Sequence, residues 1–209
     1  MASYDDVEAL RAFAQSVDVI TYEFENIPMS ALDIIEDICP IHPGRQALAV
    51  SQDRLSEKEF LTGLGLKVAP YADVTNAEQA NVAVARVGAP SILKTRRMGY
   101  DGKGQMRLKQ ASDMPAAWQA MAGSASVLEG FIDFSHEVSV IAARASDGQV
   151  ACFDPGENVH RDGILHTTTV PANLTTSQRM DAVLIAAKIL NKLNYVGIMG
   201  VELFVTADG

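Results

Sequence analysis

The segment from Leu93 to Gln105 combines glycines with positive charge, and that combination is typical of phosphate binding. Its glycines let backbone amides approach a ligand closely, and its cations neutralise charge. The residues concerned are Gly99, Gly102, Gly104, Lys94, Arg96, Arg97 and Lys103. Their spacing matches neither the P-loop nor the dinucleotide-binding fingerprint. The segment therefore predicts a polyphosphate site, with a hairpin turn carrying solvated charges as the alternative.

Three glutamates fall on predicted strands. Glu129 ends one strand, Glu137 begins another, and Glu202 lies within the apolar run Gly197–Val205. A carboxylate among apolar residues is costly if it is buried without a partner, so we expect Glu202 to face a metal, a cation or a cleft. Mg²⁺ that bridges nucleotide phosphates takes one or two carboxylates. The alternative for Glu202 is the solvent face of an edge strand.

Two further polar segments adjoin predicted strands. Residues 157–163 contain His160 and Arg161, which can hold anions, although an ordinary surface loop is the simpler interpretation. Glu23 follows a predicted buried strand over residues 17–22. Ligands of open α/β sheets bind beyond the carboxyl ends of strands. We therefore keep Glu23 as a candidate ligand-binding residue, beside the alternative of a polar loop.

Composition excludes several classes of protein. A net charge of -9 argues against a nucleic-acid partner. The two cysteines give neither a disulfide framework nor a metal motif, so we expect a reducing cytoplasm. The four histidines lack the spacing of metal ligands. The sequence also has no signal peptide and no apolar run of about 18 residues, so we expect no membrane association.

Apolar periodicity predicts an α/β protein. Helices are expected over residues 5–16, 28–39, 53–64, 76–87, 114–121 and 177–193. Strands are expected over residues 17–22, 91–94, 127–129, 137–143, 150–153, 163–170 and 197–205, with residues 66–72 extended. Such elements place the glycine-rich loop after one short strand and the glutamates on others.

The order of several motifs resembles one family. They are Tyr-Glu-Phe-Glu-Asn-Ile-Pro at 22–28, Gln-Asp-Arg at 52–54, Leu-Lys-Thr-Arg at 93–96, Gly-Tyr-Asp-Gly-Lys-Gly-Gln at 99–105, Glu-Val-Ser at 137–139 and Glu-Asn-Val-His-Arg-Asp-Gly-Ile at 157–164. Together they resemble the 5-(carboxyamino)imidazole ribonucleotide synthases, which are ATP-grasp ligases of purine biosynthesis. The resemblance extends over nearly the whole chain.

The resemblance implies an ATP-grasp fold preceded by the remnant of a Rossmann-like domain of the biotin carboxylase N-terminal type. Residues 1–50 would end that substrate-binding domain, and residues 51–90 would form linker helices and the start of the ATP-grasp region. Residues 91–135 would form a small ATP-clamping subdomain, and residues 136–209 the first part of a larger one. The family's start and end would be missing, so we expect no, or very weak, synthase activity from this piece alone.

The resemblance also implies a reaction and a set of site residues. ATP would phosphorylate bicarbonate to carboxyphosphate, and the amine of 5-aminoimidazole ribonucleotide would take up the carboxyl group, leaving ADP and phosphate. Mg²⁺ would be bound by Glu202, and the substrate would lie near Tyr100, Asp101 and Glu23. Met98 replaces a glycine common in the family, which would stiffen the entry to the loop. ATP would contact Arg54, Lys94, Gly99, Gly102, Lys103, Gly104, Gln105, Glu129, Phe131, Ile132, Glu137 and His160.

The sequence leaves two other functions open. One is a different ATP-grasp ligase, either biotin carboxylase-like or a formate-dependent glycinamide ribonucleotide transformylase. The other is a module that binds ATP without catalysis. The resemblance further implies a homodimer for the full-length protein, small-molecule partners only, and a cytoplasmic location.

Overall fold

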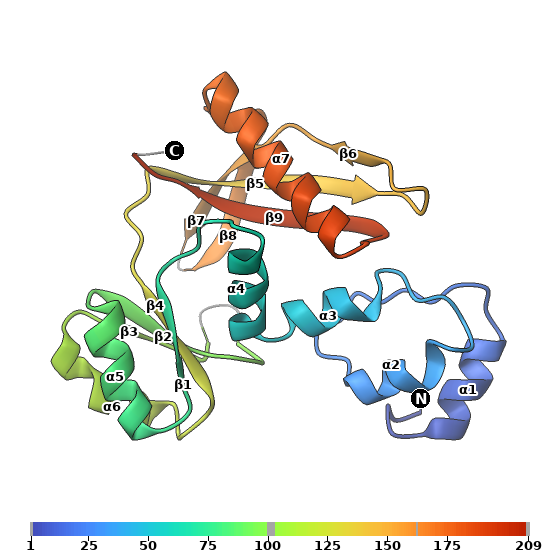
Figure 1. Cartoon of the computed structure of the whole chain (residues 1–209), viewed down its shortest axis with the longest axis horizontal. Coiled ribbons are helices and arrows are strands. Elements are labelled where there is room, and N and C mark those ends of the chain that lie inside the picture. The colour runs from blue at the N-terminus through green and yellow to red at the C-terminus, as the bar shows by residue number, and fades with distance from the viewer. Residues whose placement is uncertain (1, 100–102, 162, 208–209) are drawn as a thin grey trace.

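The computed structural model describes residues 2–99, 103–161 and 163–207 of the chain. Its elements form a helical N-terminal segment, a four-stranded sheet and a five-stranded sheet (Figure 1). Within the described residues, no helix combines the length and the apolar character needed to cross a membrane.

The N-terminal segment consists of three helices around a small apolar core. They are α1 (Val7–Gln15), α2 (Met29–Ile35) and α3 (Arg45–Ser51). The strand predicted over residues 17–22 is wrong, because Ile20 makes only an isolated parallel bridge to Ile41 and Val19 is exposed. A strand needs a continuous ladder of hydrogen bonds, and the described residues supply one bridge.

Helix α4 (Arg54–Gly63) confirms the helix predicted over residues 53–64. Asp53 caps it by accepting hydrogen bonds from the backbone N–H groups of Leu55 and Ser56. One side of α4 joins the core of the second sheet through Phe60, Leu61 and Leu64. Its first turn, by contrast, carries charged residues, so the two halves of the helix face different surroundings.

The first sheet is antiparallel, with the order β1-β4-β2-β3. Helices α5 and α6 cover one face, burying Val74, Leu93, Leu108 and Leu128 completely. The Asn76 side chain caps α5. The elements are β1 (Tyr71–Val74), α5 (Ala77–Val87), β2 (Ser91–Thr95), β3 (Gln105–Leu108), a 3-10 turn (Ala111–Asp113), α6 (Met114–Ala120) and β4 (Ser126–Gly130).

The second sheet has the order β6-β5-β7-β8, with β9 paired along the other side of β5. Helix α7 covers one face through Val140, Val201, Ala186 and Leu190. The same apolar cluster includes Ala47, and Val50 of α3 packs against it. The elements are β5 (His136–Arg144), β6 (Val150–Cys152), β7 (Gly156–Arg161), β8 (Ile164–Thr169), α7 (Thr176–Lys192) and β9 (Gly197–Val205).

Two strands lie where the sequence predicts none. β3 returns from the glycine-rich loop and pairs with β2, so Lys94 lies opposite Gln105. β7 occupies the polar segment interpreted as an ordinary loop, which is therefore a wrong prediction. Asn158 is buried and Val159 is exposed, and the register with β8 shifts between Val159 and His160. A polar strand lacks the apolar alternation on which strand prediction depends.

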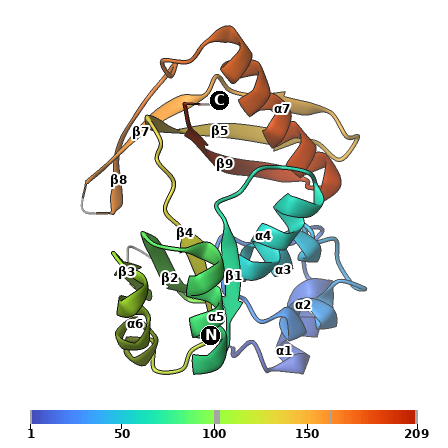
Figure 2. The same ribbon diagram turned by 60° about the vertical axis from the view of Figure 1, so that its left-hand side comes forward.

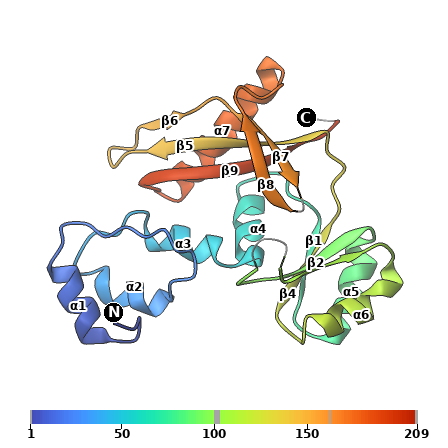
Figure 3. The ribbon, with the colours of Figure 1, turned by 180° about the vertical axis from the view of Figure 1, so that it is seen from behind.

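Helix α4 lies between the two sheets, while α7 lies on the outer side of the second sheet (Figures 1 and 2). Seen from behind, the β7–β8 hairpin extends toward the first sheet (Figure 3). Side chains alternate along a strand, so the face of β5 and β9 opposite α7 carries Glu137, Ser139, Glu202 and Phe204. That face and the first turn of α4 border the same region between the sheets.

Candidate functional site

Lys94 and Glu129 form an ion pair on the face of the first sheet opposite α5 and α6. Lys94 Nζ donates a hydrogen bond of 2.9 Å to Glu129 Oε2. Lys58, from α4, approaches the same oxygen at 3.4 Å. All three side chains are at most 21% exposed. Two ammonium groups therefore compensate one largely buried carboxylate, and this contact joins α4 to β2 and β4.

The first turn of α4 brings Arg54 to the glycine-rich loop. A β-carbon built on Gly99 would lie 3.6 Å from Arg54 Nη2. One turn further along, Glu57 keeps an exposed surface, but surrounding protein atoms and charged groups crowd its carboxyl group. The loss of solvent at this position raises the pKa of Glu57, and repulsion from Glu129 and Glu25 adds to the rise, while Arg54 and Lys58 oppose it.

Glu57 and Lys58 also belong to this cluster, although no sequence motif predicted them as site residues. Both follow Arg54 on a correctly predicted helix, at spacings of three and four residues that share its face. That spacing indicates that the three side chains share one face of the helix. It does not indicate which strands that face meets. The convergence on Glu129 is a tertiary contact and has no local pattern.

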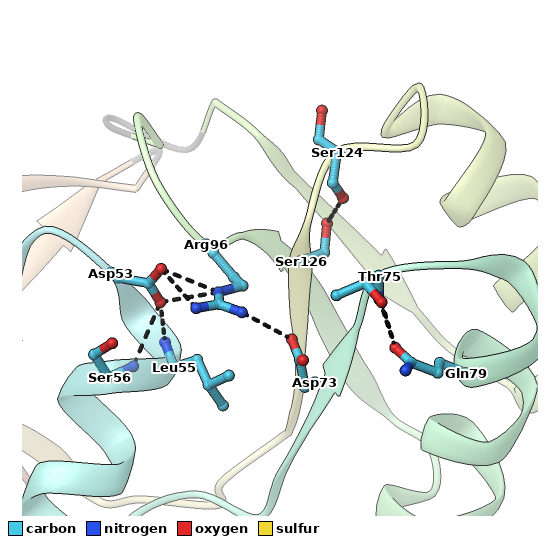
Figure 4. Close-up of polar contacts among 9 residues, drawn as sticks. All are labelled: Asp53, Leu55, Ser56, Asp73, Thr75, Gln79, Arg96, Ser124 and Ser126. Carbon is cyan, nitrogen blue, oxygen red and sulfur yellow. Dashed lines mark hydrogen bonds and ion pairs between the residues drawn. The ribbon is translucent and has the colours of Figure 1, made fainter.

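Arg96 stabilises the base of the loop and is less available for a ligand than its place in the basic segment suggested (Figure 4). Its Nη2 donates to Asp53 Oδ2 at 2.8 Å, and its Nη1 donates to Asp73 Oδ1 at 3.4 Å. Burial opposes ionisation of Asp53, but hydrogen bonds from Arg96 and from Ser56 and Leu55 of α4 outweigh it and lower the pKa of Asp53. The hydrogen bond to Asp53 likewise raises the pKa of Arg96.

The two ends of the loop meet at Thr95. The Thr95 amide donates to the Gly104 carbonyl at 2.8 Å. A β-carbon on Gly104 would lie 2.6 Å from Thr95 Oγ1, and one on Gly99 would lie 3.1 Å from it. Gly104 also has a φ of 68°, a conformation that favours glycine. These two glycines are required by close packing, whatever ligand the loop binds.

Met98 adopts a φ of 62° at the entry to the loop. This left-handed conformation is disfavoured for a residue with a side chain. Lys103 and Gln105 lie on the returning side, with Gln105 opening β3. Tyr100, Asp101 and Gly102 were predicted as site residues, and they lie outside the described residues.

Glu137, His160 and Glu202 gather on the second sheet. His160 Nδ1 lies 3.7 Å from Glu137 Oε1. Burial raises the pKa of Glu137, and the charge of Glu202 adds to the rise, while His160 opposes it. Glu202 itself is exposed on β9, two positions from the residue opposite Glu137. Its neighbour in this register is Ser139, so no cation compensates it within the described ion pairs.

Phe131 and Ile132 lie on the segment that connects the two sheets. The Phe131 amide donates to the Pro90 carbonyl at 3.0 Å, which continues the pairing of β4 with β2 beyond Gly130. Arg107 lies over the Phe131 ring, 5.5 Å from its centroid. Glu23 is exposed in the N-terminal segment, and no hydrogen bond or ion pair joins it to another described residue. The structure thus places the described candidates in one group at the first sheet and one on the second sheet, with Phe131 and Ile132 on the segment between them and Glu23 apart.

Two models of known protein families match this chain. The model of the ATP-grasp domain matches residues 59–209, most of the chain. This chain belongs to the ATP-grasp family. A second model, the ribonucleotide synthetase preATP-grasp domain, matches residues 1–52. The α/β fold class and the preceding domain expected from the sequence are therefore confirmed.

Individual ATP-grasp relatives are similar over the whole chain. The N5-carboxyaminoimidazole ribonucleotide synthase of Brucella melitensis is 47% identical over 211 residues, which cover 100% of this chain and 58% of the relative. The counterpart from Bacillus subtilis is 38% identical and is covered over 55% of its length. The chain thus spans little more than half the length of these curated relatives. The resemblance found in the sequence is confirmed by these matches.

Solved structures show the same ATP-grasp architecture. The ADP complex of an N5-carboxyaminoimidazole ribonucleotide synthetase superposes with a TM-score of 0.93 at 40% identity, covering 100% of this chain and 55% of that chain. The Aspergillus clavatus synthase, in complex with ADP and 5-aminoimidazole ribonucleotide, gives a TM-score of 0.86 at 26% identity. That match covers 99% of this chain and 54% of the other.

Proposed function

We propose that this chain binds ATP between its two sheets and is the ATP-binding part of a carboxylating carbon–nitrogen ligase. ATP phosphorylates bicarbonate to carboxyphosphate, and the amine of 5-aminoimidazole ribonucleotide takes up the carboxyl group. The products are 5-carboxyaminoimidazole ribonucleotide, ADP and phosphate, in purine biosynthesis. Support comes from the similarity to synthases over the whole chain and from the relative solved with ADP and this ribonucleotide.

The Lys94–Glu129 pair beside Arg54 is the observation that carries the proposal. Phosphoryl transfer depends on positioning and on neutralising charge, and Lys94 and Arg54 supply two cations next to the glycine-rich loop. Both are assigned to the phosphates. We assign the same role to Gly99, Lys103, Gly104 and Gln105, which lie on the two sides of the loop. Gly99 and Gly104 approach Thr95 closely.

The remaining ATP contacts are assigned by position. Glu129, Phe131 and Ile132 lie where β4 leaves the first sheet, and we assign them to adenine. Glu137 is assigned to the ribose hydroxyls, because one carboxylate accepts from two donors. His160 is placed beside Glu137 and is assigned to the nucleotide.

The described residues suit a magnesium ion that is held largely by phosphates. Among residues 2–99, 103–161 and 163–207, no group of three or more histidine, cysteine, aspartate or glutamate side chains is arranged so that it could hold a metal ion. Glu202 is exposed on the face that carries Glu137, and Mg²⁺ in nucleotide sites takes one or two carboxylates plus phosphates. We assign Glu202 to this ion. When bound, Mg²⁺ neutralises phosphate charge during transfer.

The second substrate is assigned to the N-terminal side of the site. Glu23 lies in the part that matches the preATP-grasp model, and we assign it to 5-aminoimidazole ribonucleotide. We propose the domain limits 1–50, 51–90, 91–135 and 136–209 for this arrangement. A cytoplasmic location and a homodimer of the full-length protein remain predictions, and light scattering tests the second.

Calorimetry with ATP and Mg²⁺ tests the nucleotide site. Lys94→Ala removes a charge-assisted contact worth about 1.5–3 kcal/mol, so affinity falls at least tenfold. Lys67→Ala, at an exposed lysine outside the site, leaves affinity unchanged. Equal affinity of wild type and Lys94→Ala contradicts the assignment. ADP release with bicarbonate and alternative acceptors then separates this ligase from biotin carboxylase-like and transformylase reactions, and binding without release identifies a non-catalytic module.

A further inference from the structure

Gln52 connects two segments that the proposed function places at different substrates. Its Nε2 donates to the Ile27 carbonyl at 2.6 Å, and its Oε1 accepts from Arg97 Nη2 at 2.5 Å. Only 4% of the residue is exposed. A carbonyl requires the amide nitrogen and a guanidinium requires the amide oxygen, so the orientation of the Gln52 side chain is fixed by its partners.

The backbone at Gln52 is also fixed. Gln52 is the C-cap of α3, where its N–H donates to the Leu48 carbonyl, and the next residue caps α4. Arg96 binds this corner as well, because its carbonyl accepts from the Arg54 amide at 2.9 Å while its side chain holds Asp53. A side chain on so constrained a backbone transmits a displacement of one partner to the other.

The two partners of Gln52 border functional candidates. Ile27 closes the segment that begins with Glu23, and Arg97 precedes Met98 at the entry to the glycine-rich loop. We propose that Gln52 is a positioning residue that makes the placement of the Glu23–Ile27 segment depend on the placement of residues 96–99. Its functional meaning, a link between the ribonucleotide side and the ATP side, rests on the function proposed above.

The physical basis is that neither hydrogen bond of Gln52 is independent of the other. When Arg97 leaves, the buried amide oxygen is unsatisfied, and the side chain gains freedom to leave Ile27. The loss of one hydrogen bond corresponds to about a fivefold change in a local equilibrium. The link is thus strong enough to measure by spectroscopy and too weak to determine whether the protein folds.

The test compares ¹H–¹⁵N spectra of four ligand-free variants of this 209-residue chain with wild type. Gln52→Met removes both hydrogen bonds and shifts backbone peaks of residues 23–27 and 96–99. Gln52→Glu keeps the acceptor for Arg97 but loses the donor to Ile27, so residues 23–27 shift more than residues 96–99. Arg97→Met acts at the surface and leaves Gln52 in place. Gln119→Met, at an exposed glutamine of α6, is the control and shifts neither segment.

Arg97→Met is the decisive variant. Under the proposal it shifts the peaks of residues 23–27, to which no described hydrogen bond joins Arg97, and it raises solvent exchange of the Gln52 side-chain amide about fivefold. Unchanged peaks over 23–27 together with an unchanged Gln52 amide overturn the proposal. Gln52→Glu keeps the test decisive if Gln52→Met fails to fold, because a shift of residues 96–99 equal to that of 23–27 also contradicts it.

A second arm separates this inference from the proposed function. Adding ATP and Mg²⁺ to wild type shifts residues 96–99 and, through Gln52, residues 23–27, whereas in Gln52→Glu only the first group responds. If ATP shifts no peak in wild type, the proposed ATP binding fails. The ligand-free comparison still decides the role of Gln52 in that case, because it requires no nucleotide.

Discussion

The Lys94 ammonium donates a hydrogen bond of 2.9 Å to the Glu129 carboxylate. A phosphate that binds Lys94 competes with Glu129 for the same ammonium group. Lys58, 3.4 Å from the same oxygen, is the group that remains to compensate Glu129 when Lys94 turns away. The pair of lysines therefore lets one cation change partner while a largely buried carboxylate keeps another.

Replacing Lys58 tests this exchange. Lys58→Met leaves Glu129 with Lys94 alone, so stability falls by about 1 kcal/mol and ATP affinity falls about tenfold, because Lys94 becomes harder to release. Denaturant unfolding and calorimetry with ATP and Mg²⁺ measure the two effects. Lys188→Met, on the exposed side of α7, serves as the matched control. An ATP affinity equal to that of wild type rules out the exchange.

The contact between Gly104 and Thr95 predicts a rescue. Gly104→Ala places a β-carbon against Thr95 Oγ1 at a φ of 68° and lowers the free energy of unfolding by about 1–3 kcal/mol. In the Thr95→Ala background the clash is absent and only the backbone strain remains, so the same substitution costs less. Urea unfolding of both single variants and the double variant gives the coupling. Strictly additive losses show that the two residues do not interact.

Asp53 predicts a pH-dependent term in stability. Because hydrogen bonds lower the pKa of Asp53 in the folded state, its ionised form stabilises the protein above the unfolded pKa of about 4. That contribution is lost as the pH falls through the lower folded value. Asn also caps helices, so Asp53→Asn isolates the charge and costs about 1–3 kcal/mol at pH 7.

Unfolding of Asp53→Asn and wild type is compared from pH 7 to pH 3. The difference in unfolding free energy shrinks at the acidic end. Asp18→Asn, at an exposed position, shows no comparable change. A difference that stays constant over this range means that the Arg96–Asp53 contact carries no ionic stabilisation.

Glu137 is expected to change stability with pH in the opposite direction to Asp53. Burial and repulsion from Glu202 raise its pKa, so the folded state binds this proton more tightly than the unfolded state. The resulting stability is present below the unfolded pKa of about 4.3 and is lost as pH rises through the folded value. Ionised Glu137 is therefore unfavourable at neutral pH. Glu137→Gln should melt at a higher temperature than wild type at pH 7.

The same substitution should weaken ATP binding, since the ribose hydroxyls lose an anionic acceptor. Scanning calorimetry and an ATP titration record the two properties in one variant. Glu59→Gln, on the exposed side of α4, changes neither. A lower melting temperature for Glu137→Gln than for wild type at pH 7 would mean that ionised Glu137 stabilises the folded state, which contradicts the raised pKa.

Local patterns predicted the parts of this fold that local physics determines. The helix of Arg54–Gly63, the helix of Thr176–Lys192 and the strand that carries Glu202 all follow from apolar periodicity. The prediction of a strand over residues 17–22 was wrong because an apolar run forms a strand only beside a pairing strand, and here Ile20 makes one isolated bridge to Ile41. β7 was missed because its buried positions are Gly156 and Asn158 rather than large apolar residues.

The site shows the same division. The basic loop and the three glutamates could be recognised in the sequence, and the resemblance to one family gave each of them an expected role. Its partners were not visible: Arg96 binds Asp73 across 23 positions, and Gln52 binds Arg97 across 45. Contacts over such separations depend on how the sheets and helices meet, which no short pattern encodes.

Ala47 and Val50 have a consequence for how this chain can be divided. They lie in the stretch that matches the preATP-grasp model, yet they pack into the apolar cluster beneath α7. A boundary drawn between the two matched regions in sequence therefore cuts through a shared hydrophobic core. A chimera that exchanges residues 1–52 with those of a relative must preserve the size of both side chains. Otherwise the exchanged segment no longer packs against the apolar cluster beneath α7.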